Sequence, residues 1–196
     1  MSQQDADRWD ARYAAGEYAG RTHATALLEH WISCVPRGPA IDIACGVGRN
    51  AIFMAQSGLE TEGLDVSAKA LERAQTRAAS LGVDVKWRCE DLDSVELAND
   101  HYQLIMVARF LDRRLFPQLL TALRPGGYLI YETHLATNQV DVGGPGNQRF
   151  RLQPQELLHL VHPLRVVHYF EGVTRDPDGA AMCLAQVVAC RGDGGF

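Results

Sequence analysis

The segment Ala40–Asn50, AIDIACGVGRN, limits the possible folds of this chain more than any other. It begins as an apolar strand-like run, passes through Gly46 and Gly48, and opens directly into the helix-like AIFMAQSG. Glycine has no Cβ, so the backbone of such a turn can approach a ligand closely. The start of a helix adds unpaired N–H groups and a partial positive charge. The sequence therefore predicts a strand–turn–helix unit that binds a nucleotide-like cofactor.

Two cofactors compete for this turn. Gly46, Gly48 and Ala51 fit the pattern G-x-G-x-x-G/A of dinucleotide-binding proteins. Asp65, at the end of the next strand-like run in GLDVS, could accept hydrogen bonds from the ribose hydroxyls of either NAD or S-adenosylmethionine. Asp42, just before the turn, and Asp91, in CEDLD after a third strand-like run, discriminate better. Three acidic residues at three successive strand ends favour an adenosine that also carries an amino acid.

Length and charge exclude several classes of protein. A chain of 196 residues suits one domain and leaves no room for the separate substrate domain of most dehydrogenases. The formal net charge of −5 argues against a nucleic-acid partner. The five cysteines are an odd number without C-x-x-C spacing, which indicates free thiols in a reducing, cytoplasmic setting. The polar start and the absence of a long apolar run predict no signal peptide and no membrane partner.

Strand-like and helix-like runs alternate along the chain, which predicts an α/β fold with a doubly wound, Rossmann-like parallel sheet and helices on both faces. A turn at 176–179 joins two final strands, so the last strand of seven should run antiparallel. The expected strands are 40–43, 60–64, 84–88, 103–107, 128–132, 165–170 and 182–189. The expected helices are 5–15, 22–31, 50–56, 68–81, 113–123 and one from Pro154 onward.

We expect one domain across 1–196, with four parts. Residues 1–36 form an N-terminal helical cover, and 37–134 form the cofactor-binding core. Residues 135–150 form a Gly-rich loop or lid, and 151–196 form a helix and the C-terminal β-hairpin.

Four motifs in order, DIACGVGRN, GLDVS, CEDL and LRPGG, resemble those of the class I S-adenosylmethionine-dependent methyltransferases. The resemblance covers essentially the whole chain. Within the class, the chain is similar to the tellurite-resistance methyltransferase group, through RTHATALL, CGVGRN, PGGYLI and RFRLQPQELL. Ala44 stands where the family has its first motif glycine, which is acceptable if its φ is negative.

The resemblance implies a set of cofactor contacts. Backbone groups of the turn would meet the methionine moiety, Asp65 would hold the ribose, and Asp91 would accept from the adenine amino group. Arg21 could reach a carboxylate, and two aromatic residues on the first helix could cover the cofactor. The expected contact residues are Trp9, Tyr13, Arg21, Asp42, Ala44, Cys45, Gly46, Gly48, Asp65, Val66, Asp91, Leu92, Val107 and Ala108.

Three residues are candidates for binding or activating the methyl acceptor. Arg109, in the apolar context VARFL, needs an anionic partner, which could be a ligand or a carboxylate of the protein. His134 follows the fifth strand, and His23 lies beside Arg21; either could act as a base. No His or Cys pair has metal-ligand spacing.

The sequence favours a methyltransferase for a small acceptor that is anionic, or a thiol or chalcogen. Such an acceptor needs no strong base. The alternatives are an O- or N-methyltransferase of a small metabolite and a non-catalytic nucleotide-binding regulator. The sequence indicates neither the acceptor nor the oligomeric state.

Overall fold

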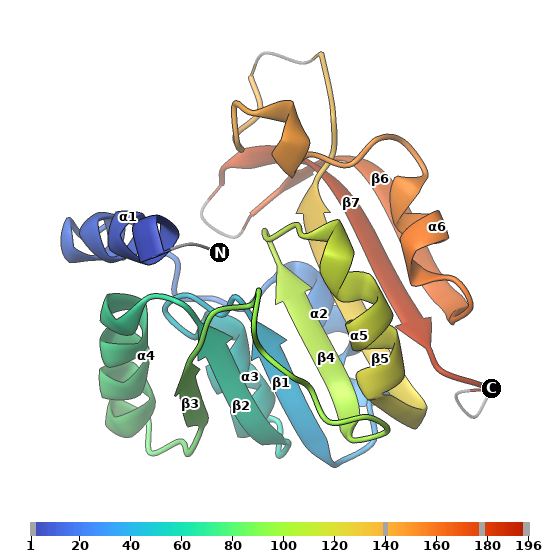
Figure 1. Cartoon of the computed structure of the whole chain (residues 1–196), viewed down its shortest axis with the longest axis horizontal. Helices are drawn as coiled ribbons and strands as arrows, with labels where there is room; N and C mark the ends of the chain where they lie inside the picture. The colour runs from blue at the N-terminus through green and yellow to red at the C-terminus, as the bar shows by residue number, and fades with distance from the viewer. Residues whose placement is uncertain (1–2, 139–140, 177–178, 194–196) are drawn as a thin grey trace.

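The protein forms one seven-stranded mixed sheet with helices on both faces (Figure 1). The computed structural model describes residues 3–138, 141–176 and 179–193. The strand order is β3-β2-β1-β4-β5-β7-β6. The strands are β1 (Pro39–Ile43), β2 (Glu60–Asp65), β3 (Lys86–Cys89), β4 (Tyr102–Ala108), β5 (Leu123–His134), β6 (Arg165–Arg175) and β7 (Ala181–Cys190). The helices are α1 (Gln3–Ala14), α2 (Ala26–Trp31), α3 (Arg49–Gln56), α4 (Ala68–Ser80), α5 (Phe116–Ala122) and α6 (Glu156–Val161), with short 3₁₀ turns at Ile32–Cys34, Arg113–Leu115 and Gln148–Phe150.

The first five strands are parallel, and β7 runs antiparallel between β5 and β6. This confirms the fold predicted from the alternating pattern. The register brings the carboxyl ends of the parallel strands to one edge: Ile43 pairs with both Leu64 and Val107, and Ala108 pairs with Glu132. In open α/β sheets, ligands bind at this edge.

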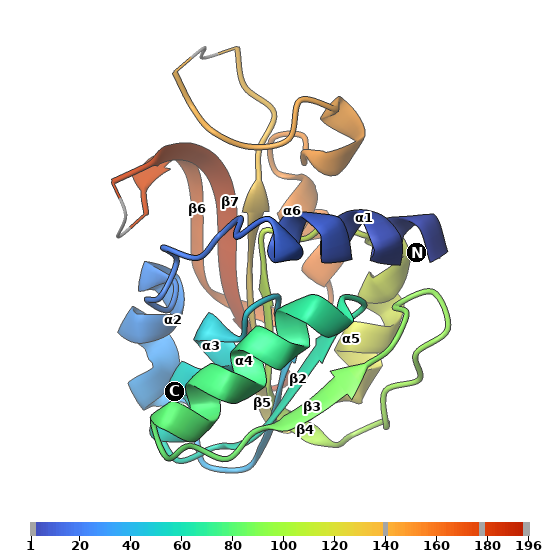
Figure 2. The same cartoon turned by 90° about the vertical axis from the view of Figure 1, so that its left-hand side faces the viewer.

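Two apolar layers hold the sheet between its helices, because side chains alternate across each strand. On one face, α5 and α6 bury Phe116, Leu119 and Leu157 against strand residues such as Ile105. On the other, α2 and α3 bury Leu28 and Met54. Figure 2 shows α2, α3 and α4 together on this second side of the sheet.

Some helices begin later than expected, each for a local reason. Helix α2 begins at Ala26 rather than Thr22, because Thr25 is the N-cap and accepts from the Leu28 N–H. The expected helix over 113–123 is a 3₁₀ turn capped by Asp112, followed by α5. Strand β5 starts at Leu123, because Leu123 already pairs with Tyr102 before the Gly126 turn.

The expected N-terminal cover divides into two different pieces. Helix α2 is part of a core layer, whereas α1 has no buried residue among those whose burial is described and lies over the start of α4 (Figures 1 and 2).

All five cysteines lie among the described residues, and each is a free thiol. Within the described ranges, no helix has the length and apolar character needed to cross a bilayer.

Candidate active site

The loop that joins β1 to α3 is tied to the end of β2 by Asp65. Asp65 Oδ2 accepts from the Gly46 N–H at 2.7 Å, and its Oδ1 accepts from the Ser67 N–H at 2.9 Å. The carboxylate is buried; burial raises its pKa, and these backbone hydrogen bonds oppose the rise. Ser67 caps α4. Asp65 therefore stands at the cofactor edge with its loop already ordered.

The two glycines of this loop are needed for different reasons. A Cβ on Gly46 would lie 2.6 Å from the Tyr13 hydroxyl oxygen, so Gly46 faces α1. A Cβ on Gly48 would lie 2.5 Å from the Trp87 ring and 2.9 Å from the Cβ of Ala74, so Gly48 faces the packing between β3 and α4.

Ala44 does not have the negative φ that was expected for it. Its φ is 55°, in the left-handed region that L residues other than glycine rarely adopt. The chain must turn here from β1 into a loop whose next residue, Cys45, donates its N–H to the Leu64 carbonyl at 3.0 Å. The strain is the consequence of an alanine at a glycine position.

Some of the backbone groups expected to contact a methionine moiety already have partners within the protein. The N–H groups of Cys45 and Gly46 are used within the protein, by the Leu64 carbonyl and by Asp65. What Cys45 and Gly46 can offer such a group is therefore carbonyl oxygen, which suits an ammonium, although the Cys45 carbonyl already accepts one hydrogen bond from the Gly48 N–H at 2.9 Å. The Cys45 thiol is buried, and burial raises its pKa, so it is not a reactive thiolate.

Asp42 lies beneath the loop and orders it. Its Oδ2 accepts from the Ala51 N–H at 3.1 Å at the start of α3, while its buried Oδ1 has no partner among the described residues. Burial raises the pKa of Asp42 to about 7. This carboxyl therefore titrates near neutral pH, beneath the predicted cofactor position.

Helix α1 brings Trp9 and Tyr13 to the same loop. Asp10 accepts from the Ser67 hydroxyl at 2.5 Å and from the Lys69 N–H at 3.1 Å, and Arg73 donates to the Tyr13 carbonyl at 3.0 Å. The rings of Trp9 and Tyr13 lie 5.9 Å apart, centroid to centroid. Their place fits the expected cover over the cofactor.

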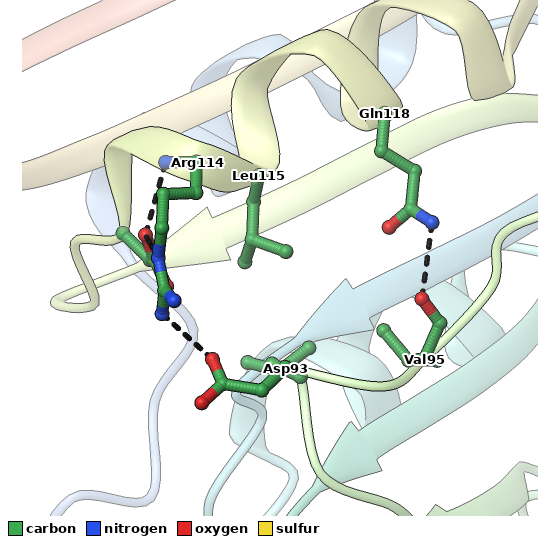
Figure 3. Close-up of a pocket in the computed structure, with 7 residues that line it drawn as sticks. Asp93, Val95, Arg114, Leu115 and Gln118 are labelled. Carbon is green, nitrogen blue, oxygen red and sulfur yellow. Dashed lines mark hydrogen bonds and ion pairs between the residues drawn. The ribbon is translucent and has the colours of Figure 1, made fainter.

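Asp91 and Leu92 follow β3, as the motif order required. Asp91 Oδ1 accepts from the Asp93 N–H at 2.9 Å, and Leu92 is buried. Leu92 lines a cavity of about 220 Å³ between this loop and α5, together with Asp93, Val95, Asp112, Arg114, Leu115 and Gln118. Figure 3 shows Arg114 reaching Asp93 and Gln118 reaching the Val95 carbonyl across it. Val66, half-buried after β2, completes the set expected at the adenine end.

Beyond Val107 and Ala108, at the end of β4, Arg109 turns back with a φ of 60°. Its Nε donates to Glu132 at 3.0 Å, its Nη1 lies 2.8 Å from the Met182 sulfur, and its Nη2 pairs with Asp176. Glu132 also accepts from Gln186 at 2.9 Å. The partners that an arginine in this apolar context required are therefore carboxylates of the protein in this structure.

Arg49, the first residue of α3, lies beside this group without a carboxylate of its own. It donates to the His23 carbonyl at 3.2 Å and has no ion pair among the described residues. Burial lowers its pKa, Asp176 and Glu132 raise it, and Arg109 and Arg21 lower it. His23 itself is exposed, so its carbonyl, not its ring, is what joins it to this group.

His134 ends β5 on the same face of the sheet as Glu132. Its Nδ1 is buried without a partner in the described part of the chain, and a Cβ on Gly144 would lie 2.6 Å from it. Burial lowers the pKa of His134 to about 3, and Arg109, Arg151 and Arg21 lower it further. His134 is therefore neutral across the physiological range.

Four residues of this region were not predicted. Trp87 supports the loop, Glu132 and Asp176 bind Arg109, and buried Arg151 donates to the Leu135 and Pro145 carbonyls at 3.0 and 2.9 Å. Glu132 could have been found, because a carboxylate in the apolar strand YLIYET needs a cation. Asp176 could not, because it is far from Arg109 in sequence. No cluster of potential metal ligands occurs in the ranges that the structure describes.

Part of the chain is similar to known methyltransferases. The family model described as a methyltransferase domain matches residues 40–127. Over 99 residues the chain is 29% identical to the ubiquinone biosynthesis O-methyltransferase of Serratia proteamaculans, covering 47% of this chain and 41% of that protein. The chain spans about half the length of the curated relatives it matches, at 41%, 46% and 53% for three of them.

Solved structures share the fold at low sequence identity. TehB from Haemophilus influenzae has a TM-score of 0.73 at 17% identity, covering 92% of this chain and 66% of that one. An S-adenosylmethionine-dependent methyltransferase from Methanosarcina mazei has a TM-score of 0.69 at 15% identity, covering 87% and 99%. Residues 40–127 thus match the model of a methyltransferase domain, and the chain has the fold of the S-adenosylmethionine-dependent methyltransferases, whose cofactor is S-adenosylmethionine.

Proposed function

We propose that this protein transfers the methyl group of S-adenosylmethionine to a small anionic acceptor. The observation that carries the proposal is the group of cations at the carboxyl edge of β4 and β5. Arg109 and Arg151 lie near the neutral His134, and Arg49 lies near Arg109, with Glu132 and Asp176 as the nearby carboxylates. Arg21 acts on both Arg49 and His134, so it belongs to the same group. Because the cations of this group outnumber its carboxylates, the site favours a negatively charged ligand.

The cofactor would lie along the loop at 44–48, with its ribose at Asp65 and its adenine near Val66, Asp91 and Leu92. Trp9 and Tyr13 on α1 would cover it. This arrangement would direct the methyl group toward Val107, Ala108 and Arg109, where the acceptor would bind. The protein would mainly align the nucleophile with the methyl group and exclude water.

An acceptor that is already ionised, such as a thiolate or a chalcogen oxyanion, would need no base. Arg49 is available to such an acceptor, because it has no ion pair among the described residues and its hydrogen bond is to a backbone carbonyl. Arginine binds oxyanions through parallel N–H donors. Arg49 and Arg109 would therefore hold the acceptor's charge.

A second candidate is O-methylation of a small metabolite. Two observations favour it: the likeness to an O-methyltransferase, and the unpartnered Nδ1 of a neutral His134. A neutral imidazole can accept a proton from a hydroxyl group. His134 would then be the base, whereas exposed His23 would have no such part.

We also propose that the loop at 136–147 acts as a lid for the acceptor. Its described part is held at two points. The Gly143 N–H donates to the Ala181 carbonyl at 2.8 Å, and the Pro145 carbonyl accepts from Arg151 at 2.9 Å. Residues 139–140 lie outside the described residues. Hydrogen exchange across 136–147 should slow when S-adenosylhomocysteine and an acceptor are both bound, and equal exchange would leave the loop as a connector.

Transfer of labelled methyl groups to a panel of acceptors tests the function. The panel holds thiols, selenite, tellurite, carboxylated phenols and amines. We expect turnover with anionic members, reduced at least tenfold in Arg49→Gln and unchanged in Arg165→Gln, an exposed charge at the start of β6. Turnover confined to neutral alcohols and lost in His134→Gln would favour O-methylation. Cofactor binding without any turnover would favour a non-catalytic regulator.

A further inference from the structure

Asp176 is a buried carboxylate at the tip of a hairpin, where side chains are ordinarily solvated. It follows the last residue of β6, and its N–H and carbonyl close the turn with Ala180 and Gly179 at 2.9 and 2.8 Å. Its residue exposure is only 7%, because its side chain reaches inward to Arg109. The hairpin tip therefore places a negative charge inside the group of cations described above.

Arg109 already has another counter-ion. Glu132 is 1% exposed and lies in the central part of the sheet between β4 and β7, where Gln186 also holds it at 2.9 Å. One carboxylate neutralises one guanidinium. Asp176 is thus a second carboxylate on Arg109, contributed by a turn rather than by the sheet.

The contact of Asp176 is also incomplete. Its Oδ1 pairs with Arg109, but its Oδ2 is buried and has no partner among the described residues. A buried oxygen without a hydrogen-bond donor destabilises the arrangement that holds it. Arg49 lies close enough for Asp176 to be the largest influence that raises its pKa, but the two form no ion pair. Asp176 therefore lies near both Arg49 and Arg109 but forms an ion pair only with Arg109.

Building on the proposed function, we propose that Asp176 determines acceptor specificity by occupying the position that the acceptor's anionic group takes on Arg109. An acceptor binds there by displacing the Asp176 side chain. The exchange breaks one ion pair and forms another, while Glu132 remains on Arg109. A neutral acceptor gains nothing from the exchange, so Asp176 excludes it. Acceptors with two charged oxygens are favoured, because they can engage Arg49 as well.

Calorimetric titration of selenite and of sulfate, with S-adenosylhomocysteine saturating, tests this proposal. We expect Asp176→Asn and Asp176→Ala to bind at least one of these anions tenfold or more tightly than the unmodified protein. Asp193→Asn removes the same charge at an exposed position and should leave anion affinity unchanged. Adding Arg109→Gln to Asp176→Asn should abolish the gain.

The outcomes separate this proposal from the proposed function. Equal anion affinity with and without Asp176, in proteins that bind the anion through Arg109, overturns the competition alone. Weaker binding in both Asp176 variants also overturns it, because Asp176 would then be part of the anion site. Binding of S-adenosylhomocysteine without binding of either anion by any variant overturns both the competition and the anionic acceptor.

Discussion

The ring of Trp87 stands where a side chain on Gly48 would have to be: a Cβ there would lie 2.5 Å from the ring atom Cη2. Gly48, a glycine of the predicted cofactor-binding turn, is thus required by protein packing. The same ring excludes a Cβ from Gly63 on β2, also at 2.5 Å. Trp87 therefore joins the cofactor loop, β2 and α4 into one packed unit.

Gly48→Ala should destabilise the protein by about 1–3 kcal/mol more than a matched change without the clash. Gly82→Ala is that control, because Gly82 has a φ of 65° and nothing within 4 Å of its Cβ position. Urea unfolding measures both variants. Adding Trp87→Leu should reduce the penalty at Gly48, and equal penalties at the two glycines would refute the packing role.

Ala44→Gly should stabilise the protein, since the φ of 55° at Ala44 is strained for alanine and free for glycine. We expect a gain in unfolding free energy of about 0.5–1 kcal/mol, the strain of about 1–2 kcal/mol less the extra entropy of glycine in the unfolded chain. Ala78→Gly, in buried helical conformation in α4, should instead lose about 1 kcal/mol or more. A loss of unfolding free energy in both variants would contradict the strained φ of Ala44.

Asp42 should make the protein less stable as the pH rises from about 4 to about 7. Its pKa rises from 3.8 to about 7 on folding, so between these values the folded state binds a proton that the unfolded state has lost. The stability of Asp42→Asn relative to the parent should therefore improve by about 1.4 kcal/mol per pH unit over this range and level off above it. Urea unfolding at pH 5 and 8 measures the difference. Exposed Asp84→Asn is the control, and a flat difference at Asp42 would contradict its raised pKa.

His134 should destabilise the protein in acid. Its pKa falls from 6.5 to about 3 on folding, so between these values the unfolded state binds the extra proton and stability is lost as the pH falls. His134→Gln should lose less stability than the parent between pH 7 and 5, by about 1.4 kcal/mol per pH unit below 6.5. His101→Gln, an exposed histidine, serves as the control. The same loss in His134→Gln and the parent would show that His134 charges normally.

The sequence predicted what depends on local pattern. Strand–helix alternation and the acidic strand ends at Asp42, Asp65 and Asp91 led to the sheet, its cofactor edge and the domain class. It failed where distant residues decide. The φ of Ala44 depends on how the loop crosses to Leu64, and the partners of Arg109 come from β5 and the hairpin tip. Helix starts were misplaced where a cap, such as Thr25, competes with the apolar pattern.

Calorimetric titration with S-adenosylhomocysteine tests the central claim most directly, that the edge at Asp65 holds this cofactor. The unmodified protein should bind it saturably at one site and should bind no nicotinamide dinucleotide. Asp65→Ala should bind it at least tenfold more weakly, about 1.4 kcal/mol, because a ribose would lose a charged acceptor. Asp65→Asn, which can still accept from the Gly46 N–H, separates loss of charge from loss of loop order. Unchanged affinity in a folded Asp65→Ala protein, or saturable binding of a nicotinamide dinucleotide instead, would contradict the account.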